Sequence, residues 1–150
     1  MYEHIKFKNA INMRKANYDK FPSTKLTGML VQGWDSIISM LKKKMDARKV
    51  LAVDLYTGVY EEEVLDAFSK EFSGRVMNVR DLMKPEKEIQ TLTERFMTED
   101  VLFGYVTNLK LEDYLDADKV AAARKQISEA KDAIVIIGTG AAAVAPQDAM

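Results

Sequence analysis

The chain contains no cysteine among its 150 residues, which excludes disulfide bonds and thiolate metal sites. Its single histidine, His4, excludes a metal centre with several histidines of this chain, and no Ser/His/Asp triad can be assembled. No run of about 18 apolar residues is present, so we expect no membrane-spanning helix. The N-terminus also lacks the apolar core of a signal peptide. These absences together predict a cytoplasmic protein.

Charge of either sign is not in excess, because 22 basic and 23 acidic residues give a net charge of -1 at pH 7. This balance provides no global attraction to nucleic acid or to an anionic membrane, so neither is an expected partner. A hydrophobic fraction of 47% is sufficient for a single core. We therefore expect one domain at residues 26–150 and, before it, a locally basic N-terminal arm at residues 1–25.

Four short β-type runs alternate with amphipathic helical stretches along the domain. The runs cover residues 50–55, 75–79, 101–107 and 133–138. Helices are expected after the cap residue Asp35, over residues 61–72, from Pro85 onward, and from Asp116 or Asp118 to Ala130. This alternation predicts an α/β fold with three layers, doubly wound, around a mostly parallel sheet of about four core strands. We expect the domain to be incomplete, because no closing helix is expected after Gly138.

The carboxyl ends of parallel strands meet at one edge of a sheet, where open α/β folds bind ligands. Polar and glycine residues follow each of the expected strands, and they form our candidate ligand site. Its members are Asp54, Thr57, Gly58, Asp81, Thr107, Gly138, Thr139 and Gly140. Asp54 could bind a sugar hydroxyl or a metal ion. The alternative for every member is a role in turns and helix caps, and no residue is assigned to catalysis.

Two glycine-containing loops follow expected strands, but neither completes a phosphate-binding motif. Residues 54–58 precede a helix, yet they hold one glycine, no lysine follows it, and Glu61, Glu62 and Glu63 would repel a triphosphate. Residues 138–143 match G-x-G-x-x-A, although they follow the fourth run and Pro146 opposes a continuing helix. We expect a degenerate loop in the first case and a structural glycine turn in the second.

Five short sequence motifs follow one another along the chain. They are Asn-Tyr-Asp-Lys-Phe-Pro at 17–22, Gly-Trp-Asp at 33–35, Val-Asp-Leu-Tyr-Thr-Gly-Val at 53–59 with Glu-Glu-Glu-Val-Leu at 61–65, Leu-Phe-Gly-Tyr-Val at 102–106, and Gly-Thr-Gly-Ala-Ala at 138–142. Together they resemble the N-terminal region of the long bacterial class I mannose-6-phosphate isomerases. In that family an α/β region with a kinase-like layout precedes a cupin-type isomerase region. The resemblance spans most of residues 17–145.

The resemblance implies a parent protein of carbohydrate metabolism that interconverts mannose 6-phosphate and fructose 6-phosphate. Zinc is expected in the parent's cupin region, and this chain has no counterpart of the metal-binding residues, so no cofactor is expected here. The implied role is a non-catalytic ligand-binding, regulatory or assembly region, with a sugar phosphate or nucleotide as its small ligand. Two alternatives stay open: a kinase-like phosphotransferase with a degenerate phosphate loop, and an oligomerisation domain whose edge strand pairs with another chain.

Overall fold

The computed structural model describes residues 21–25, 27–45 and 49–150. The chain divides into two compact units, Met1–Leu30 and Val31–Met150. The second unit contains all the helices and strands of the described residues. Most of the expected arm at residues 1–25 lies outside the described residues, and the α/β unit begins at Val31.

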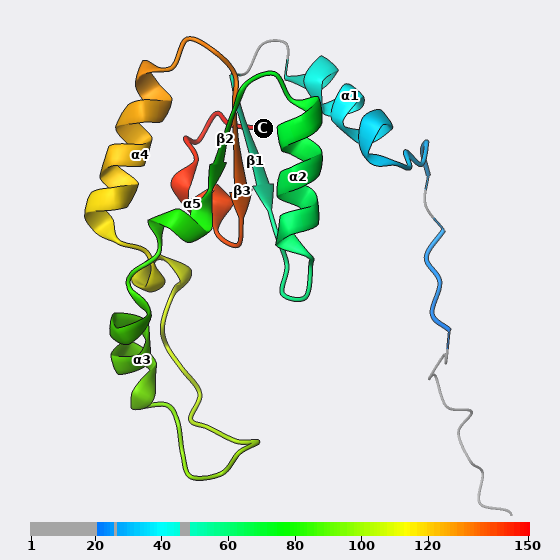
Figure 1. Ribbon diagram of the computed structural model, residues 1–150. Coiled ribbons are helices and arrows are strands. Elements are labelled where there is room, and N and C mark those ends of the chain that lie inside the picture. The colour runs from blue at the N-terminus through cyan, green and yellow to red at the C-terminus, as the bar shows by residue number, and fades with distance from the viewer. Residues whose placement is uncertain (1–20, 26, 46–48) are drawn as a thin grey trace, which may run out of the picture. The chain divides into compact units, whose positions relative to one another are not determined.

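Three parallel strands form the sheet, in the order β1–β3–β2 (Figure 1). They are β1 (Val50–Asp54), β2 (Arg75–Asn78) and β3 (Ile134–Gly138). The last strand in the sequence is therefore the central one, and its Val135 pairs with Leu51 on one side and Val76 on the other. All five residues of β3 are buried, as a strand covered on both faces requires.

Helices cover both faces of this sheet (Figure 1). One face carries α1 (Trp34–Lys44) and α2 (Glu61–Glu71), and the other carries α4 (Ala117–Glu129) and the short α5 (Ala141–Val144). Phe68 and Ile137 lie in the core on the first face, while Ile127 and Ile136 lie in the core on the second. The three-layer α/β fold predicted from the sequence is confirmed, with three strands in place of about four.

Local capping chemistry explains where two of the helices begin. Asp116 caps α4, because its Oδ1 accepts hydrogen bonds from the amides of Asp118 (3.0 Å) and Lys119 (3.1 Å). The predicted cap role of Asp35 is wrong. Helix α1 begins two residues earlier than that cap requires, at Trp34 after Gly33, and Asp35 lies in its first turn, where its negative charge interacts favourably with the helix dipole.

The predicted strand over residues 101–107 is also wrong. This segment belongs to a long excursion between β2 and α4, residues 84–114, which we call the excursion lobe and which contains α3 (Glu86–Glu94) and the 3₁₀ helix η2 (Leu111–Tyr114). Its run of apolar and aromatic residues suits a strand, but β3 occupies the place between β1 and β2, and Val101 is 98% exposed.

The two ends of the excursion lobe are tied together at its base. Met83 and Leu115 form an isolated antiparallel bridge. The amide of Lys84 donates to the carbonyl of Tyr114 (3.0 Å), and that of Asp116 donates to the carbonyl of Leu82 (2.9 Å). Because Leu82 and Leu115 are buried, these bonds fasten the lobe to the core beneath α4.

Candidate functional site

The strand order brings several predicted site residues to the carboxyl edge of the sheet. Asp54 ends β1, Gly138 ends β3, and the two are paired in register. Thr139 and Gly140 follow directly and lie in the turn that leads into α5. The structure therefore places Asp54 beside the turn at residues 138–140, as the parallel-sheet rule predicts.

Asp54 is engaged by the backbone of that turn. Its Oδ1 accepts a hydrogen bond from the amide of Gly140 (3.0 Å), and its Oδ2 accepts one from the amide of Ala142 (3.2 Å). Thr139 Oγ1 donates to the carbonyl oxygen of Leu55 at 3.0 Å. Both side chains thus fasten the end of β1 to the start of α5, which is the turn-and-cap role.

The two glycines of the turn are needed for its shape and its packing. Gly140 has φ of +91°, and a Cβ placed on it would lie 2.9 Å from Leu111 Cδ2. Gly138 has φ of +136°, and its Cβ would lie 2.9 Å from Val79 Cβ. In a dinucleotide site, such glycines let a pyrophosphate approach the backbone. Here the corresponding space is filled by apolar side chains of the domain.

Thr57 and Gly58 lie in the exposed loop between β1 and α2. Nothing comes within 4 Å of a Cβ placed on Gly58, whose φ is +94°. Glycine is therefore favoured here by the backbone conformation and not by packing. The loop leads into the acidic first turn of α2, where Glu61 pairs with Arg80 at 3.1 Å. An acidic helix start opposes a bound phosphate, so this loop lacks the electrostatics of a nucleotide site.

The two remaining predicted site residues lie elsewhere. Asp81 is exposed in the 3₁₀ helix η1 (Val79–Leu82) and lines a hollow of about 330 Å³ beside Lys119 of α4. Thr107 lies in the excursion lobe, where its Oγ1 accepts from the amide of Leu109 (3.0 Å). Its predicted place at the sheet edge is therefore wrong, because the strand that would have carried it there does not form.

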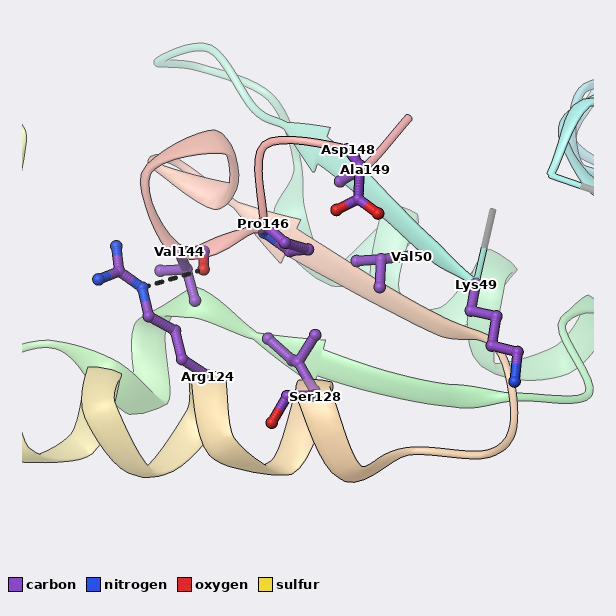
Figure 2. A pocket seen from close by; sticks show the side chains of 9 residues that line it. Lys49, Val50, Arg124, Ser128, Val144, Pro146, Asp148 and Ala149 are labelled. Atoms are coloured by element: carbon purple, nitrogen blue, oxygen red, sulfur yellow. Dashed lines mark hydrogen bonds between the residues drawn. The ribbon is translucent and has the colours of Figure 1, made fainter. Parts of the chain in front are cut away.

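A hollow of about 550 Å³ lies near the amino end of β1, where the sequence predicted no site (Figure 2). Its wall combines apolar Val50 and Val144 with charged Lys49 and Asp148. Arg124 lies at its rim and is held there by α5, because its Nη2 donates to the carbonyl of Ala143 (2.8 Å). No motif marks these residues, and the rule for open sheets points to the opposite ends of the strands.

The outer edge of β1, on the side away from β3, carries an unexpected partial ladder. The amide of Met150 donates to the carbonyl of Val50 (3.0 Å), and the carbonyl of Met150 accepts from the amide of Ala52 (2.8 Å). This alternation is the hydrogen-bond pattern of a parallel bridge opposite Leu51. Within the described residues, the next outward groups on this edge, the Ala52 carbonyl and the Asp54 amide, have no backbone partner.

Comparison with known proteins identifies the family of the compact unit. A family model matches residues 33–150. The chain belongs to DUF8485, a domain of unknown function. The DUF8485 match coincides closely with the unit that begins at Val31. No curated protein and no solved structure matches the chain.

Two further findings bear on the kind of site that the DUF8485 domain can hold. Over the described ranges, histidine, aspartate and glutamate side chains form no group of three that could bind a metal ion. Among the helices that the structure describes, none has both the length and the apolar character needed to cross a membrane. The carboxyl edge of the sheet is thus a hydrogen-bonded turn, while the outer edge of β1 presents open backbone groups.

Proposed function

We propose that this DUF8485 domain is a non-catalytic assembly region of a mannose-6-phosphate isomerase-like protein of carbohydrate metabolism, acting in the cytoplasm. The single observation that carries the proposal is the parallel bridge of Met150 on the outer edge of β1. The bridge begins a ladder that a further strand would extend toward Asp54. The function is to take up that strand and so join this sheet to another part of an assembly.

The open edge belongs to a sheet that is built for burial. Parallel sheets have both faces covered, and an unpaired edge strand is a template for another chain. In β1, Leu51 is buried and Ala52 and Val53 are partly buried, so the strand already lies within the core layers. A strand added beside it would satisfy the Ala52 carbonyl and the Asp54 amide in the same parallel pattern.

Side chains around Met150 define what the added strand must carry. Met150 packs against the core cluster of α1 and α2, whereas Ala149 lines the hollow on the opposite face, beside α4 and α5. Because side chains alternate along a strand, its residues would face the two layers in turn. The fitting partner is therefore an extended strand that is apolar on both faces.

The geometry supports assembly over the alternatives of ligand binding and phosphotransfer. Asp54 carries the carboxylate best placed for a sugar hydroxyl, but its two oxygens already accept hydrogen bonds from two backbone amides of the turn. The β1–α2 loop has one glycine and no lysine after it, and Glu61, Glu62 and Glu63 follow in α2. A phosphate-transfer loop needs a basic side chain and open amides at that point.

An extended chain tests the edge directly. Adding Ile-Val-Ile-Val-Thr after Met150 should raise the melting temperature and slow amide exchange of Asp54 by about tenfold or more, because the ladder gains a strand. Adding Ser-Gly-Ser-Gly-Thr is the matched control and should leave both unchanged. Equal melting temperatures for the two extended chains would contradict the proposal.

A titration separates the alternatives. Isothermal calorimetry of the chain with mannose 6-phosphate, and with ATP and magnesium, should show no saturable heat if the domain acts in assembly. Saturable binding of ATP that requires magnesium would instead support a phosphotransferase. Binding of mannose 6-phosphate that is lost in Asp54→Ala, with the fold intact, would restore the ligand site at the carboxyl edge.

A further inference from the structure

The sheet has a second open edge, on the outer side of β2. The amide of Arg75 donates to the carbonyl of Ala133 (3.0 Å), and Arg75 pairs with Ile134 in register. Because the backbone groups of successive strand residues point to alternate sides, those of Val76 and Asn78 point away from β3. Within the described residues, these outward amides and carbonyls have no backbone partner. An added strand can therefore pair with them.

A hollow of about 330 Å³ adjoins this edge, between β2 and α4. All residues of β2 line it, together with Ala122, Gln126 and the buried Ala123 of α4. Arg124 and Ser128, on another side of the same helix, line the hollow near β1 that Figure 2 shows. Helix α4 thus separates two hollows, and the one beside β2 lies next to the unpaired backbone groups of the edge.

The position of α4 decides what kind of partner fits the edge. Neighbouring strands of a sheet lie about 4.8 Å apart, whereas packed helices need about 8–10 Å between their axes. Because α4 lines the edge of β2, two copies paired through β2 would bring their α4 helices over the same seam. A single extended segment brings no helix of its own and adds to a sheet edge through main-chain hydrogen bonds. The edge therefore favours an extended segment of a partner protein over a second copy of this domain.

The charges along the hollow differ between its two ends. At the amino end of β2, Arg75 is exposed, and no carboxylate of the described residues forms an ion pair with it. Beyond the carboxyl end, Lys119 lies beside Asp81 and directly follows Asp118, so its charge is offset there. The Lys119 ammonium also donates to the carbonyl of Met83 (3.1 Å). The unopposed charge on this edge is therefore the Arg75 guanidinium, and a carboxylate is its complement.

Other charged residues around the ends of β2 come with a neighbour of opposite sign. Two of these sets are ion pairs, at 3.1 Å and 3.9 Å, and the others are adjacent in the sequence just before β2 or β3. They are Arg80 with Glu61, Lys125 with Glu129, Lys70 with Glu71, and Lys131 with Asp132. These neighbours leave the preference for an acidic residue opposite Arg75 unchanged.

The alternation of side chains gives the sequence pattern of the partner. Met77 packs against the core on the face of α4 and Val76 against the core on the other face, so Arg75 shares the face of Met77. A partner residue opposite Arg75 lies on this face, where Asp or Glu forms a cross-strand ion pair. The residue two positions along lies opposite Met77, near the buried Leu82 and Ala123 of the hollow, and should be apolar. This pattern holds for either strand direction.

We propose that the outer edge of β2 binds an extended segment of a partner protein as an added strand, with an acidic residue opposite Arg75 and an apolar residue opposite Met77. The main chain of the segment pairs with Val76 and Asn78, and α4 covers one of its faces. This edge lies across the sheet from the outer edge of β1, so the inference does not rest on the proposed function.

Fluorescence anisotropy with two labelled peptides tests the proposal. The first peptide, Ser-Thr-Glu-Thr-Val-Thr-Ser, places glutamate and valine on one face of a strand, and the second has lysine in place of glutamate. The glutamate peptide should bind saturably, and the lysine peptide should bind about fivefold or more weakly, because the cross-strand pair becomes repulsive. Equal affinities, or no saturable binding of the glutamate peptide, would overturn the proposal.

A charge reversal in the domain provides the matched test. In Arg75→Glu the preference should invert, so that the lysine peptide binds more tightly, and the fold should persist because Arg75 is exposed. Lys87→Glu, at an exposed position of α3, changes the charge in the same direction and should keep the original preference. An unchanged preference in Arg75→Glu would mean that the peptides bind elsewhere and that the proposal is wrong.

Hydrogen exchange locates the bound peptide on the sheet. With the glutamate peptide bound, the amides of Val76 and Asn78 should exchange more slowly, and the amide of Asp54 on the outer edge of β1 should not change. Protection of Asp54 in place of Val76 and Asn78 would overturn this inference. The proposed function would then still stand on the extended chain, so failure of one proposal is distinguishable from failure of the other.

Discussion

Every residue of β3 is buried in the α/β core, whereas no residue of the excursion lobe is buried. Both regions carry strong strand formers, Ile-Val-Ile-Ile in one and Val-Leu-Phe-Gly-Tyr-Val in the other. The two regions differ because β3 has a paired strand on each side, whereas the lobe segment pairs with no strand within the described chain. Burial is thus decided by neighbours in space, and strand propensity alone does not secure it.

The contrast separates residues that stabilise the domain from residues that serve something else. Apolar side chains in the core contribute to folding in proportion to the area that they bury. Apolar side chains on the lobe bury little, so they add little to the stability of one chain. Substitutions in the two regions should therefore differ widely in cost, and the following variants test that difference in order of expected effect.

Phe68→Ala should have the largest effect. Phe68 is 2% exposed and packs between α2 and the sheet. Loss of a buried phenyl ring and the cavity it leaves should lower the free energy of unfolding by about 3–5 kcal/mol, measured by urea denaturation. Ser69→Ala, at the exposed neighbouring position of α2, is the control. A loss below about 1 kcal/mol for Phe68→Ala would show that this side chain is not core.

Gly140→Val tests the seam between core and lobe. Valine at φ of +91° is strained, and its Cβ would press on Leu111 of the lobe. We expect a loss of about 1–3 kcal/mol from the backbone alone, with the contact adding to it. Gly58→Val has a similar φ and open space around it, so it isolates the backbone part. Equal losses in the two variants would mean that Leu111 does not pack against the turn.

Asp54→Ala should have a moderate effect on stability. Removing the carboxylate leaves the amides of Gly140 and Ala142 without their acceptor, at a cost of about 1–2 kcal/mol. Thermal unfolding measures the loss, and Asp81→Ala, an exposed carboxylate in η1, is the control. An unchanged melting temperature for Asp54→Ala would argue that this residue is free to serve a ligand.

Phe103→Ala should have the smallest effect on the fold. Its ring is 72% exposed, so the free energy of unfolding, measured by urea denaturation, should change by less than about 0.5 kcal/mol. If Phe103→Ala lowered the free energy of unfolding by several kcal/mol, the lobe would be part of the folding core, and the contrast between core and lobe would be wrong.

The sequence predicted the parts of the fold that depend on local chemistry. Residues 50–54, 75–78 and 134–138 form strands inside the predicted runs, and Asp116 caps α4 as its side chain chemistry requires. Strand order was not predictable, because a parallel strand looks alike at any place in a sheet. Residues 101–107 were predicted as a strand for a related reason, because residue type shows strand propensity but does not show whether a neighbouring strand is there to pair with.

The candidate site was predictable only in part. The pairing of Asp54 with Gly138 follows from the parallel-sheet rule, so their proximity could be predicted. Whether the Asp54 carboxylate faces a ligand or the amides of its own turn depends on atomic geometry that no spacing records. The bridge of Met150 to β1 had no signal at all, because backbone hydrogen bonds of an edge leave no mark on residue type. The resemblance to the isomerase family stays a prediction.

The central position of β3 has a consequence for synthesis of the chain. A ribosome releases β1 and β2 first, and neither can pair with the other, because the strand that lies between them is made more than fifty residues later. Until it emerges, the apolar faces of α1 and α2 have no sheet to cover. The nascent domain therefore passes through a long exposed interval and closes in one late step, and during that interval a chaperone would find the most to bind.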